Sequence, residues 1–415
     1  MPSPIVINEA EVVKTFDNLE IELRKVIRRE VRDLRHREAG GRIADELVAL
    51  VRSRWDNAPS LHHWWTQMDG GDFGSVPLNS LYDRLDDLGV SVDRVLRVLA
   101  RTYGWLASPP LLIVDDTSAH KFGLRMEGAS SVRVANIKCS VLGHTVVTLM
   151  LASPGGALFL DHEVKVNPSR PRLARHPGRP IEEVRVSRRT RKWEMALELI
   201  RKARAKGIDA AWVLFDCAYF NAGSEVPRRL TKAHVNFISK AKSSDSFIID
   251  GKKMTAKEFQ SECASYKRVR QTDHFFCQKR AMLMDGTVVK LVATWFFRGR
   301  SLKKSRAVLV TNALDTPGAS VVLTYLQRWQ TERGYQDWKR SMGGMAYHAT
   351  DFKKTRNYIR VGFLAYALAR RARQILATPL GLPTLLAVRK RTVRTMMATR
   401  KTQDQDAETM IQRAA

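Results

Sequence analysis

Three acidic residues of this sequence stand at positions suited to metal chemistry. Asp115 directly follows the apolar run Leu111–Val114, and Asp216 directly follows Trp212–Phe215. Such short, continuous apolar runs predict strands that are buried on both faces. Glu332 lies in a segment that we expect to be helical, and a helix packed across two neighbouring strand ends can bring a third carboxylate to them. Mg²⁺ and Mn²⁺ prefer oxygen ligands of this kind, and a pair of such ions can assist phosphoryl transfer at both the attacking and the leaving oxygen.

Each aspartate also has an alternative interpretation. Strands often end in turns that favour Asp, so either residue, taken singly, is better explained as a turn residue. Asp116 adds a second ambiguity, because either member of the Asp115–Asp116 pair could point into a site. We favour Asp115 as the first ligand because it directly follows the buried run.

The helical segment carries the stronger pattern. One long helix is expected from the cap at Asp315 to about Met342, and Tyr325, Arg328, Glu332 and Lys339 follow one another at steps of three, four and seven residues within that helix. At roughly 100° per residue, these four side chains fall within about a sixth of the helix circumference. A carboxylate flanked by a phenol, a guanidinium and an ammonium suits a phosphate backbone that passes over a metal ion. The alternative is a solvated helix face with an i,i+4 ion pair between Arg328 and Glu332.

These four residues resemble the Tyr-Arg-Glu-Lys signature of a large group of bacterial insertion-sequence transposases of the DDE type. Two, three and six residues separate the four positions, and all three gaps match that signature. Residues 114–118 resemble the first motif of the family, an Asp followed two residues later by Ser or Thr. Residues 215–220 resemble the second motif, with Ala218 where Gly is more usual. The resemblance covers about residues 105–370.

The resemblance implies an α/β protein with a ribonuclease H-like catalytic core and a β-rich insertion, to which the pattern of residues 1–104 adds an N-terminal helical domain. It implies that Mg²⁺ or Mn²⁺, as two ions, binds the catalytic carboxylates Asp115, Asp216 and Glu332. Phosphates near the cleaved transposon end would contact the other signature residues, Tyr325, Arg328 and Lys339. The partner would be double-stranded DNA, both transposon ends and target, and two protomers would pair two ends as a homodimer.

Composition points to the same class of partner. Among 415 residues, 70 Lys and Arg stand against 42 Asp and Glu, which gives a formal charge of +28. A surface this positive attracts polyanions, and nucleic acid is favoured over a membrane because the charge runs along the whole chain. The sequence shows neither a signal peptide nor an apolar run of ~18 residues, so no membrane association is expected. The expected location is the bacterial cytoplasm, near the nucleoid. We therefore expect the four cysteines to be reduced thiols, namely Cys139, Cys217, Cys263 and Cys277.

The pattern along the chain predicts five parts. Residues 1–104 are expected to be helical, with Gly40-Gly41 ending the first helix, and they suit a helix-turn-helix DNA-binding domain as well as an ordinary helical bundle. The remaining parts are the first part of the core at 105–230, the β-rich insertion at 231–305, the second part of the core at 306–376 and a basic tail at 377–415.

Two weaker patterns suggest further DNA contacts. Trp295 lies in the expected insertion, and related transposases stack a flipped base on an insertion-domain tryptophan, although a core aromatic of a strand is the better supported interpretation. A basic run supplies four candidates for phosphate contact, slightly favoured over a solvated charged face by the total charge. These candidates are Arg188, Arg189, Arg191 and Lys192.

The sequence therefore predicts metal-dependent cleavage of transposon ends, followed by strand transfer into target DNA. Two alternatives remain open. One is a nuclease of the same fold that cuts without joining, and the other is a catalytically inactive DNA-binding protein. The second predicts salt-dependent binding without metal-dependent cleavage.

Overall fold

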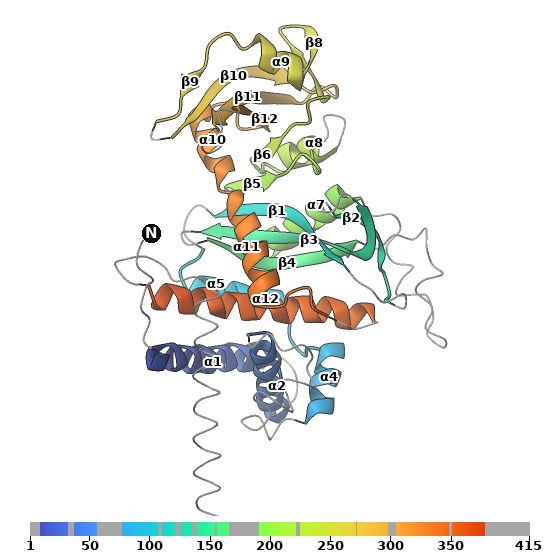
Figure 1. The fold of residues 1–415 in the computed structure, drawn as a ribbon, viewed down its shortest axis with the longest axis vertical. Coiled ribbons are helices and arrows are strands. Elements are labelled where there is room, and N and C mark those ends of the chain that lie inside the picture. The colour runs from blue at the N-terminus through green and yellow to red at the C-terminus, as the bar shows by residue number, and fades with distance from the viewer. Residues whose placement is uncertain are drawn as a thin grey trace, which may run out of the picture.

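A computed structural model of the chain describes most of the molecule between residues 9 and 377 (Figure 1). The described residues are 9–31, 37–55, 77–106, 110–120, 126–134, 139–153, 156–165, 191–220, 225–270, 272–297, 304–347 and 351–377. A mixed sheet forms the centre, with N-terminal helices at one end of the molecule and a group of strands at the other.

Twelve strands share one sheet, in the order β2-β3-β1-β5-β6-β12-β11-β10-β7-β8, with β4 paired to β3 and β9 paired to β10. The strands are β1 Leu111–His120, β2 Ser130–Val134, β3 Cys139–Ser153, β4 Gly156–Lys165, β5 Trp212–Phe215, β6 Phe237–Lys240, β7 Ser246–Ile249, β8 Lys252–Thr255, β9 Lys267–Arg268, β10 His274–Met282, β11 Val288–Phe297 and β12 Lys304–Thr311.

The central strands have the arrangement that positions the acidic residues. β1, β3 and β4 form an antiparallel meander, whereas β5 pairs parallel to β1 and β6 pairs parallel to β5. Of the apolar runs that we expected to be buried, residues 112–114 of β1 and 213–215 of β5 are buried, whereas Leu111 and Trp212, which begin the strands, are half-buried. This mixed sheet, together with its helices, makes an α/β protein that is compatible with the ribonuclease H-like fold.

The first strand is longer than its apolar run indicates. We expected it to end at Asp115, but β1 continues to His120 because β3 is 15 residues long and pairs with it as far as Gly143. Its parallel pairing with β5, in contrast, stops at Val114 and Phe215. Asp115 therefore lies within β1, at the point where the strand loses one of its two neighbours.

The helices cover both sides of the sheet. They are α1 Glu9–Val31, α2 Arg37–Trp55, α4 Leu78–Asp86, α5 Val92–Thr102, α7 Lys192–Ala205, α8 Glu225–Lys232, α9 Ala256–Glu262, α10 Gly318–Leu326, α11 Trp329–Ser341 and α12 Phe352–Ile375. Among the helices that the structure describes, we find none with the length and apolar character needed to cross a membrane.

Two helix boundaries differ from the expectation. Gly40 and Gly41 lie inside α2 and do not end a helix, because an interior glycine costs only about 1 kcal/mol relative to alanine and the buried residues after it hold the helix. The long helix expected from Asp315 to Met342 is two helices. It breaks at Gln327 and Arg328, whose amides donate to carbonyls only three residues earlier, at 3.1 and 3.0 Å, which tightens the turn.

Helix α12 joins the N-terminal helices to the core. It lies between the sheet and the helices α1, α2 and α4 (Figure 1). Its first turn is capped by Asp351, whose side chain accepts a hydrogen bond of 2.9 Å from the amide of Lys354. The apolar residues of α12 are buried from Ile359 to Ala372 on both of its faces. One continuous apolar core therefore includes residues of the N-terminal helices, of α12 and of the sheet.

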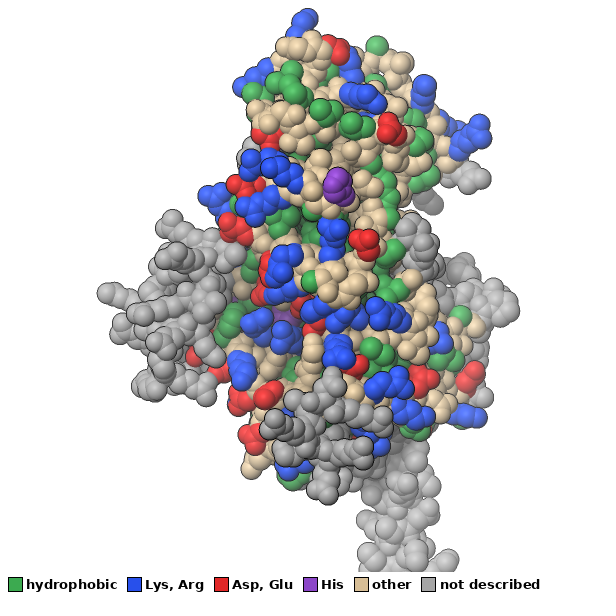
Figure 2. Space-filling view, turned by 180° about the vertical axis from the view of Figure 1, so that it is seen from behind, with side chains coloured by type: hydrophobic (Ala, Val, Ile, Leu, Met, Phe, Trp, Pro, Cys, Tyr) green, Lys and Arg blue, Asp and Glu red, His purple; other side chains and the backbone are tan. Residues whose placement is uncertain are grey.

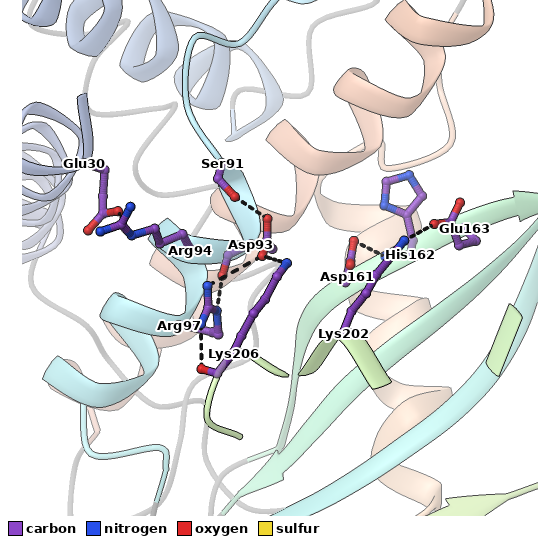
Figure 3. A network of polar contacts seen from close by, with 10 residues as sticks. All are labelled: Glu30, Ser91, Asp93, Arg94, Arg97, Asp161, His162, Glu163, Lys202 and Lys206. Atoms are coloured by element: carbon purple, nitrogen blue, oxygen red, sulfur yellow. Dashed lines mark hydrogen bonds and ion pairs between the residues drawn. The ribbon is translucent and has the colours of Figure 1, made fainter. Parts of the chain in front are cut away.

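Ion pairs reinforce the same junction (Figure 3). Asp93 at the start of α5 accepts hydrogen bonds from Ser91 and from Lys206, which follows α7. Arg97 donates back to the carbonyl oxygen of Lys206 at 2.7 Å. Glu30 of α1 pairs with Arg94 of α5 at 2.5 Å. Polar contacts thus connect α1, α5 and α7 where the N-terminal helices meet the core.

The expected insertion shares the sheet of the core. β6 falls within residues 231–305, yet it pairs with β5 on one side and with β12 on the other. The strands β7 to β11 gather at the end of the molecule opposite the N-terminal helices (Figure 1). The backbone ladder therefore runs without interruption from the core into this segment.

A buried histidine makes the stability of this fold sensitive to pH. His162 of β4 is fully buried, its ring packs edge-on against Phe363, and neither ring nitrogen has a hydrogen-bond partner among the described residues. Burial, with smaller contributions from Arg360, Arg356 and Lys202, lowers the pKa of His162 well below its usual value. The imidazole is therefore neutral in the folded protein, whereas the unfolded chain takes up a proton as the pH falls below about 6.5.

We expect His162→Phe to remove part of the acid sensitivity of the protein. Below pH ~6.5 the unfolded wild-type chain gains a proton that the folded one does not, which destabilises the fold by up to about 1.4 kcal/mol per pH unit. Urea unfolding at a series of pH values measures this slope. Identical slopes for the wild type and His162→Phe would contradict the assignment.

Candidate active site

Two of the predicted carboxylates lie side by side because of strand register. Val114 and Phe215 are the last residues that pair between β1 and β5, so Asp115 and Asp216 are the next residues on adjacent parallel strands. Asp115 is also held by β3, where its register partner is Thr148. The spacing of neighbouring strands is about 5 Å, which brings the two carboxylates within range of one shared cation.

Asp115 and Asp116 take different roles. Successive side chains of a strand point to opposite faces of a sheet. Asp116 accepts hydrogen bonds from Lys192 at 2.7 Å and from Tyr219 at 3.0 Å, one on each of its carboxylate oxygens. Asp115 instead faces Arg328, whose Nη1 lies 2.9 Å from its Oδ2. The geometry therefore favours Asp115 as the ligand on the side of α11.

Arg328 brings the third carboxylate to the same place. Its Nη2 donates to Oε1 of Glu332 at 3.1 Å while its Nη1 contacts Asp115, so one guanidinium bridges the two acids. The side chains of Arg328 and Asp115 are each 15 % exposed, whereas that of Glu332 is 40 % exposed. Arg328 also interacts electrostatically with Asp216. The ion pair between Arg328 and Glu332 that we considered as a solvated-face contact is thus present, but it is directed into the cluster of acids.

Negative charge exceeds positive charge around Asp115. Burial raises the pKa of Asp115 to about 7, and the neighbouring Asp116 and Asp216 contribute to the rise. Arg328 and the backbone N–H of Asp116 act in the opposite direction. A group so poised gains from an additional cation, since a nearby positive charge favours its ionised form.

The three acids fit a hard divalent ion by their chemistry. Within the described ranges, no three His, Cys, Asp or Glu side chains are gathered in a way that would hold a metal. The guanidinium of Arg328 stands between Asp115 and Glu332. The guanidinium shows that a cation is stable between these carboxylates, and carboxylate oxygens are the ligands that Mg²⁺ and Mn²⁺ prefer.

Helix α11 is seated on the sheet by a buried tryptophan. Trp338 is fully buried and packs against Phe159 of β4 and Phe363 of α12, with ring centroids 5.2 Å apart in both cases. Gly344 and Gly362 give the indole its space, since a Cβ on Gly344 would lie 2.1 Å from the Trp338 ring and one on Gly362 would lie 2.8 Å from it. This close packing fixes α11, and with it Glu332.

The other two signature residues point inward. The hydroxyl of Tyr325 is buried and has no hydrogen-bond partner among the described residues, and its ring centroid lies 5.9 Å from the guanidinium carbon of Arg328. Lys339 donates to the carbonyl oxygen of Ser118 in β1 at 3.2 Å, and burial lowers its pKa. In this structure both side chains serve the packing of α10 and α11 around the acids.

The weaker candidates that the structure describes are engaged in other contacts. Trp295 stacks face to face on Phe275, with centroids 4.1 Å apart, and edge-on against Tyr266, as expected of a strand aromatic. Lys192 is engaged with Asp116, and Arg191 caps α7 as an exposed residue. Two further members of the basic run lie outside the described residues, namely Arg188 and Arg189.

Three residues of this region were missed in the sequence. Trp329 follows Arg328 and is 52 % exposed, which gives the rim of the site a large aromatic surface. Tyr219 supports Asp116, and Tyr335 contacts Thr148 of β3. The spacing of Tyr335, three residues after Glu332, was a signal for a shared helix face that could have been used.

A comparison with protein families bears on this cluster. Residues 178–368 match the family model of the transposase DDE domain. That span contains Asp216, Glu332 and the whole Tyr-Arg-Glu-Lys pattern, whereas Asp115 precedes it. A comparison with curated proteins finds no match. The family match supports a DDE transposase.

The two neighbouring aspartates make a matched pair of variants. We expect Asp115→Asn to weaken Mn²⁺ binding at least about tenfold, since it removes a ligand charge facing Glu332. Asp116→Asn keeps Mn²⁺ affinity and lowers the free energy of unfolding by about 1 kcal/mol, because it weakens the contacts with Lys192 and Tyr219. Electron paramagnetic resonance of free Mn²⁺ and urea unfolding provide the two measurements. The reverse outcome would make Asp116 the ligand.

Two glycine variants test whether close packing around Trp338 holds α11 on the sheet. Gly344→Ala forces a methyl group into the Trp338 ring and is expected to lower the free energy of unfolding by about 1–3 kcal/mol. Gly41→Ala is the control, because no atom lies within 4 Å of the added Cβ, and it is expected to stabilise α2 by about 0.5–1 kcal/mol. Equal stability of Gly344→Ala and the wild type would show that the slot is not close-packed.

Proposed function

We propose that this protein is a DNA transposase that cleaves transposon ends and joins them to target DNA by metal-dependent phosphoryl transfer. The observation that carries the proposal is the guanidinium of Arg328 bridging Asp115 and Glu332, with Asp216 following the strand next to that of Asp115. The family match to the transposase DDE domain supports it.

Asp115, Asp216 and Glu332 would hold the divalent ions, as two Mg²⁺ or Mn²⁺. When bound, these ions supply Lewis-acid activation of the attacking oxygen and neutralise charge on the leaving oxygen. The chain itself orients the three carboxylates, through strand register for the aspartates and through the seat of α11 for Glu332. In the first reaction water attacks the phosphorus, the bond to the 3′ oxygen breaks and a 3′-hydroxyl leaves. In the second that hydroxyl attacks a target phosphodiester, so one P–O bond replaces another.

Arg328 acquires a second role when cations occupy the site. Its two ion pairs with Asp115 and Glu332 are then in competition with the ions, and the guanidinium becomes available to a phosphate. Arginine binds phosphate with the same two-pronged geometry that it uses on carboxylates. Tyr325, beneath Arg328, and Lys339, further along α11, would complete the phosphate contacts of the signature.

Electrostatics support DNA as the partner. Figure 2 shows Lys and Arg side chains gathered across the middle of one face, with fewer acidic side chains among them. Together with a formal charge of +28, this provides long-range attraction for a phosphate backbone. Trp329, which follows Arg328 in the chain, has a half-exposed indole that would offer a stacking surface for a base.

The remaining architecture is part of the same proposal. The N-terminal helices would bind DNA, the segment around β7 to β11 would be the family's insertion, and two protomers would pair two ends. The protein would act on chromosomal DNA in a bacterial cytoplasm. The basic candidates for backbone contact are Arg188, Arg189, Arg191 and Lys192, with Trp295 as a candidate in the insertion.

Asp216→Asn and Glu332→Gln are expected to abolish cleavage, with losses of more than about 1,000-fold, because each removes a charged ligand from the site of phosphoryl transfer. Salt-dependent DNA binding should persist in both variants. The measurement uses labelled DNA carrying candidate transposon ends with Mg²⁺ or Mn²⁺, and Glu198→Gln on the exposed surface of α7 is the control. Wild-type cutting by either variant would remove that residue from the site.

Joining is tested separately from cutting. Pre-cleaved ends with a free 3′-hydroxyl, incubated with supercoiled target DNA, should give joined product with the wild-type protein. Cleavage without joined product would identify a nuclease of this fold. Binding without either reaction would identify an inactive DNA-binding protein.

A further inference from the structure

A buried tyrosine links the helix of Glu332 to the strand pair of Asp115. Tyr335 lies three residues after Glu332 in α11, and its hydroxyl is hydrogen-bonded to Oγ1 of Thr148, with both groups buried. Thr148 is the register partner of Asp115 in the pairing of β1 with β3. Its Oγ1 lies 3.4 Å from the carbonyl oxygen of Asp115. The contact therefore joins α11 to the sheet at the level of the first acid.

Burial raises the pKa of Tyr335 well above its usual value, and the charge of Asp115 adds to the rise, so the phenol stays protonated. Either hydroxyl can be the donor in the contact between Tyr335 and Thr148. Thr148 in turn reaches the backbone of β1 at the carbonyl oxygen of Asp115. The two contacts therefore connect α11 to β3 and β3 to β1.

The other attachments of α11 lie further along the helix. Trp338 fills its slot beside Phe159 one turn later, and Lys339 reaches Ser118, three residues beyond Asp115. Arg328 holds the start of the helix, but its two ion pairs involve the very carboxylates that a divalent ion would occupy. When Arg328 is displaced, the contact of Tyr335 with Thr148 still ties the turn that carries Glu332 to the sheet.

We propose that Tyr335 is a positioning residue, whose hydroxyl sets the separation of Glu332 from Asp115 through Thr148 and thereby the affinity of the acids for a divalent ion. The inference rests on the proposed function. Tyr335 itself does not touch the ion or the DNA. Mutation of outer contacts that orient ligands typically lowers metal affinity about 10–100-fold.

Tyr335→Phe removes the hydroxyl and keeps the buried ring. We expect the affinity of the full-length protein for Mn²⁺, measured by electron paramagnetic resonance without DNA, to fall about tenfold. The matched control is Tyr366→Phe, which removes another buried phenol hydroxyl beneath α11, near Gly334, and should leave Mn²⁺ affinity unchanged. Urea unfolding of the two variants establishes that the folds are equally intact.

A double-variant cycle separates positioning from general packing. Thr148→Val should weaken Mn²⁺ binding as much as Tyr335→Phe does, and the double variant should be no weaker than either, because both remove the same link. Thr148→Ser keeps a hydroxyl at that position and should restore most of the affinity. If Tyr335→Phe does not fold, the Val and Ser variants of Thr148 decide the question.

Three results would overturn the inference: unchanged Mn²⁺ affinity in Tyr335→Phe, additive losses in the double variant, or an equal loss in Tyr366→Phe. A failure of the proposed function has a different signature. In that case the Glu332→Gln and Asp115→Asn variants would bind Mn²⁺ as tightly as the wild-type protein does. If only Tyr335→Phe keeps its Mn²⁺ affinity while the acid variants lose theirs, the proposed metal site is retained and only the positioning role of Tyr335 is rejected.

Discussion

One guanidinium between two carboxylates governs the architecture of this site. Asp115 is mostly buried and lies next to Asp116 and Asp216, a concentration of negative charge that burial makes unfavourable. Arg328 offsets it by contacting Asp115 and Glu332 together. Removing one partner of a buried ion pair leaves an uncompensated charge, which costs several kcal/mol. A cation between these acids therefore stabilises their ionised forms.

The rest of the molecule places the groups that this cation holds. The end of the parallel pairing between β1 and β5 sets Asp115 beside Asp216, a consequence of backbone hydrogen bonding alone. Glu332 depends on side-chain packing instead, because α11 is seated by Trp338 between aromatic rings and two glycines. The aspartates are thus positioned by backbone pairing within the sheet, and the glutamate by side-chain packing of α11.

Local patterns in the sequence predicted the elements but not their junctions. The apolar runs before Asp115 and Asp216 indicated the buried strands, and the short spacing of Tyr325, Arg328 and Glu332 indicated a common face. The continuation of β1 beyond Asp115 came from its pairing with the long strand β3, which local composition does not encode. On either side of the break at Gln327, α10 packs against β6 and β10 to β12 and α11 packs against β1 and β4, an arrangement that local composition does not encode. The contact of Arg328 with Asp115 joins residues 213 positions apart, and the contact of Asp116 with Lys192 joins residues 76 positions apart. Local patterns predict neither contact.

The position of β6 has a mechanical consequence. It is hydrogen-bonded to β5, the strand that leads to Asp216, and also to β12, which carries the ladder on to β11 and β10. A hinge between the acids and the distal strands would have to break several backbone hydrogen bonds, each worth about 1 kcal/mol. A force on the distal strands is therefore transmitted to the strand of Asp216 through the continuous hydrogen-bonded sheet.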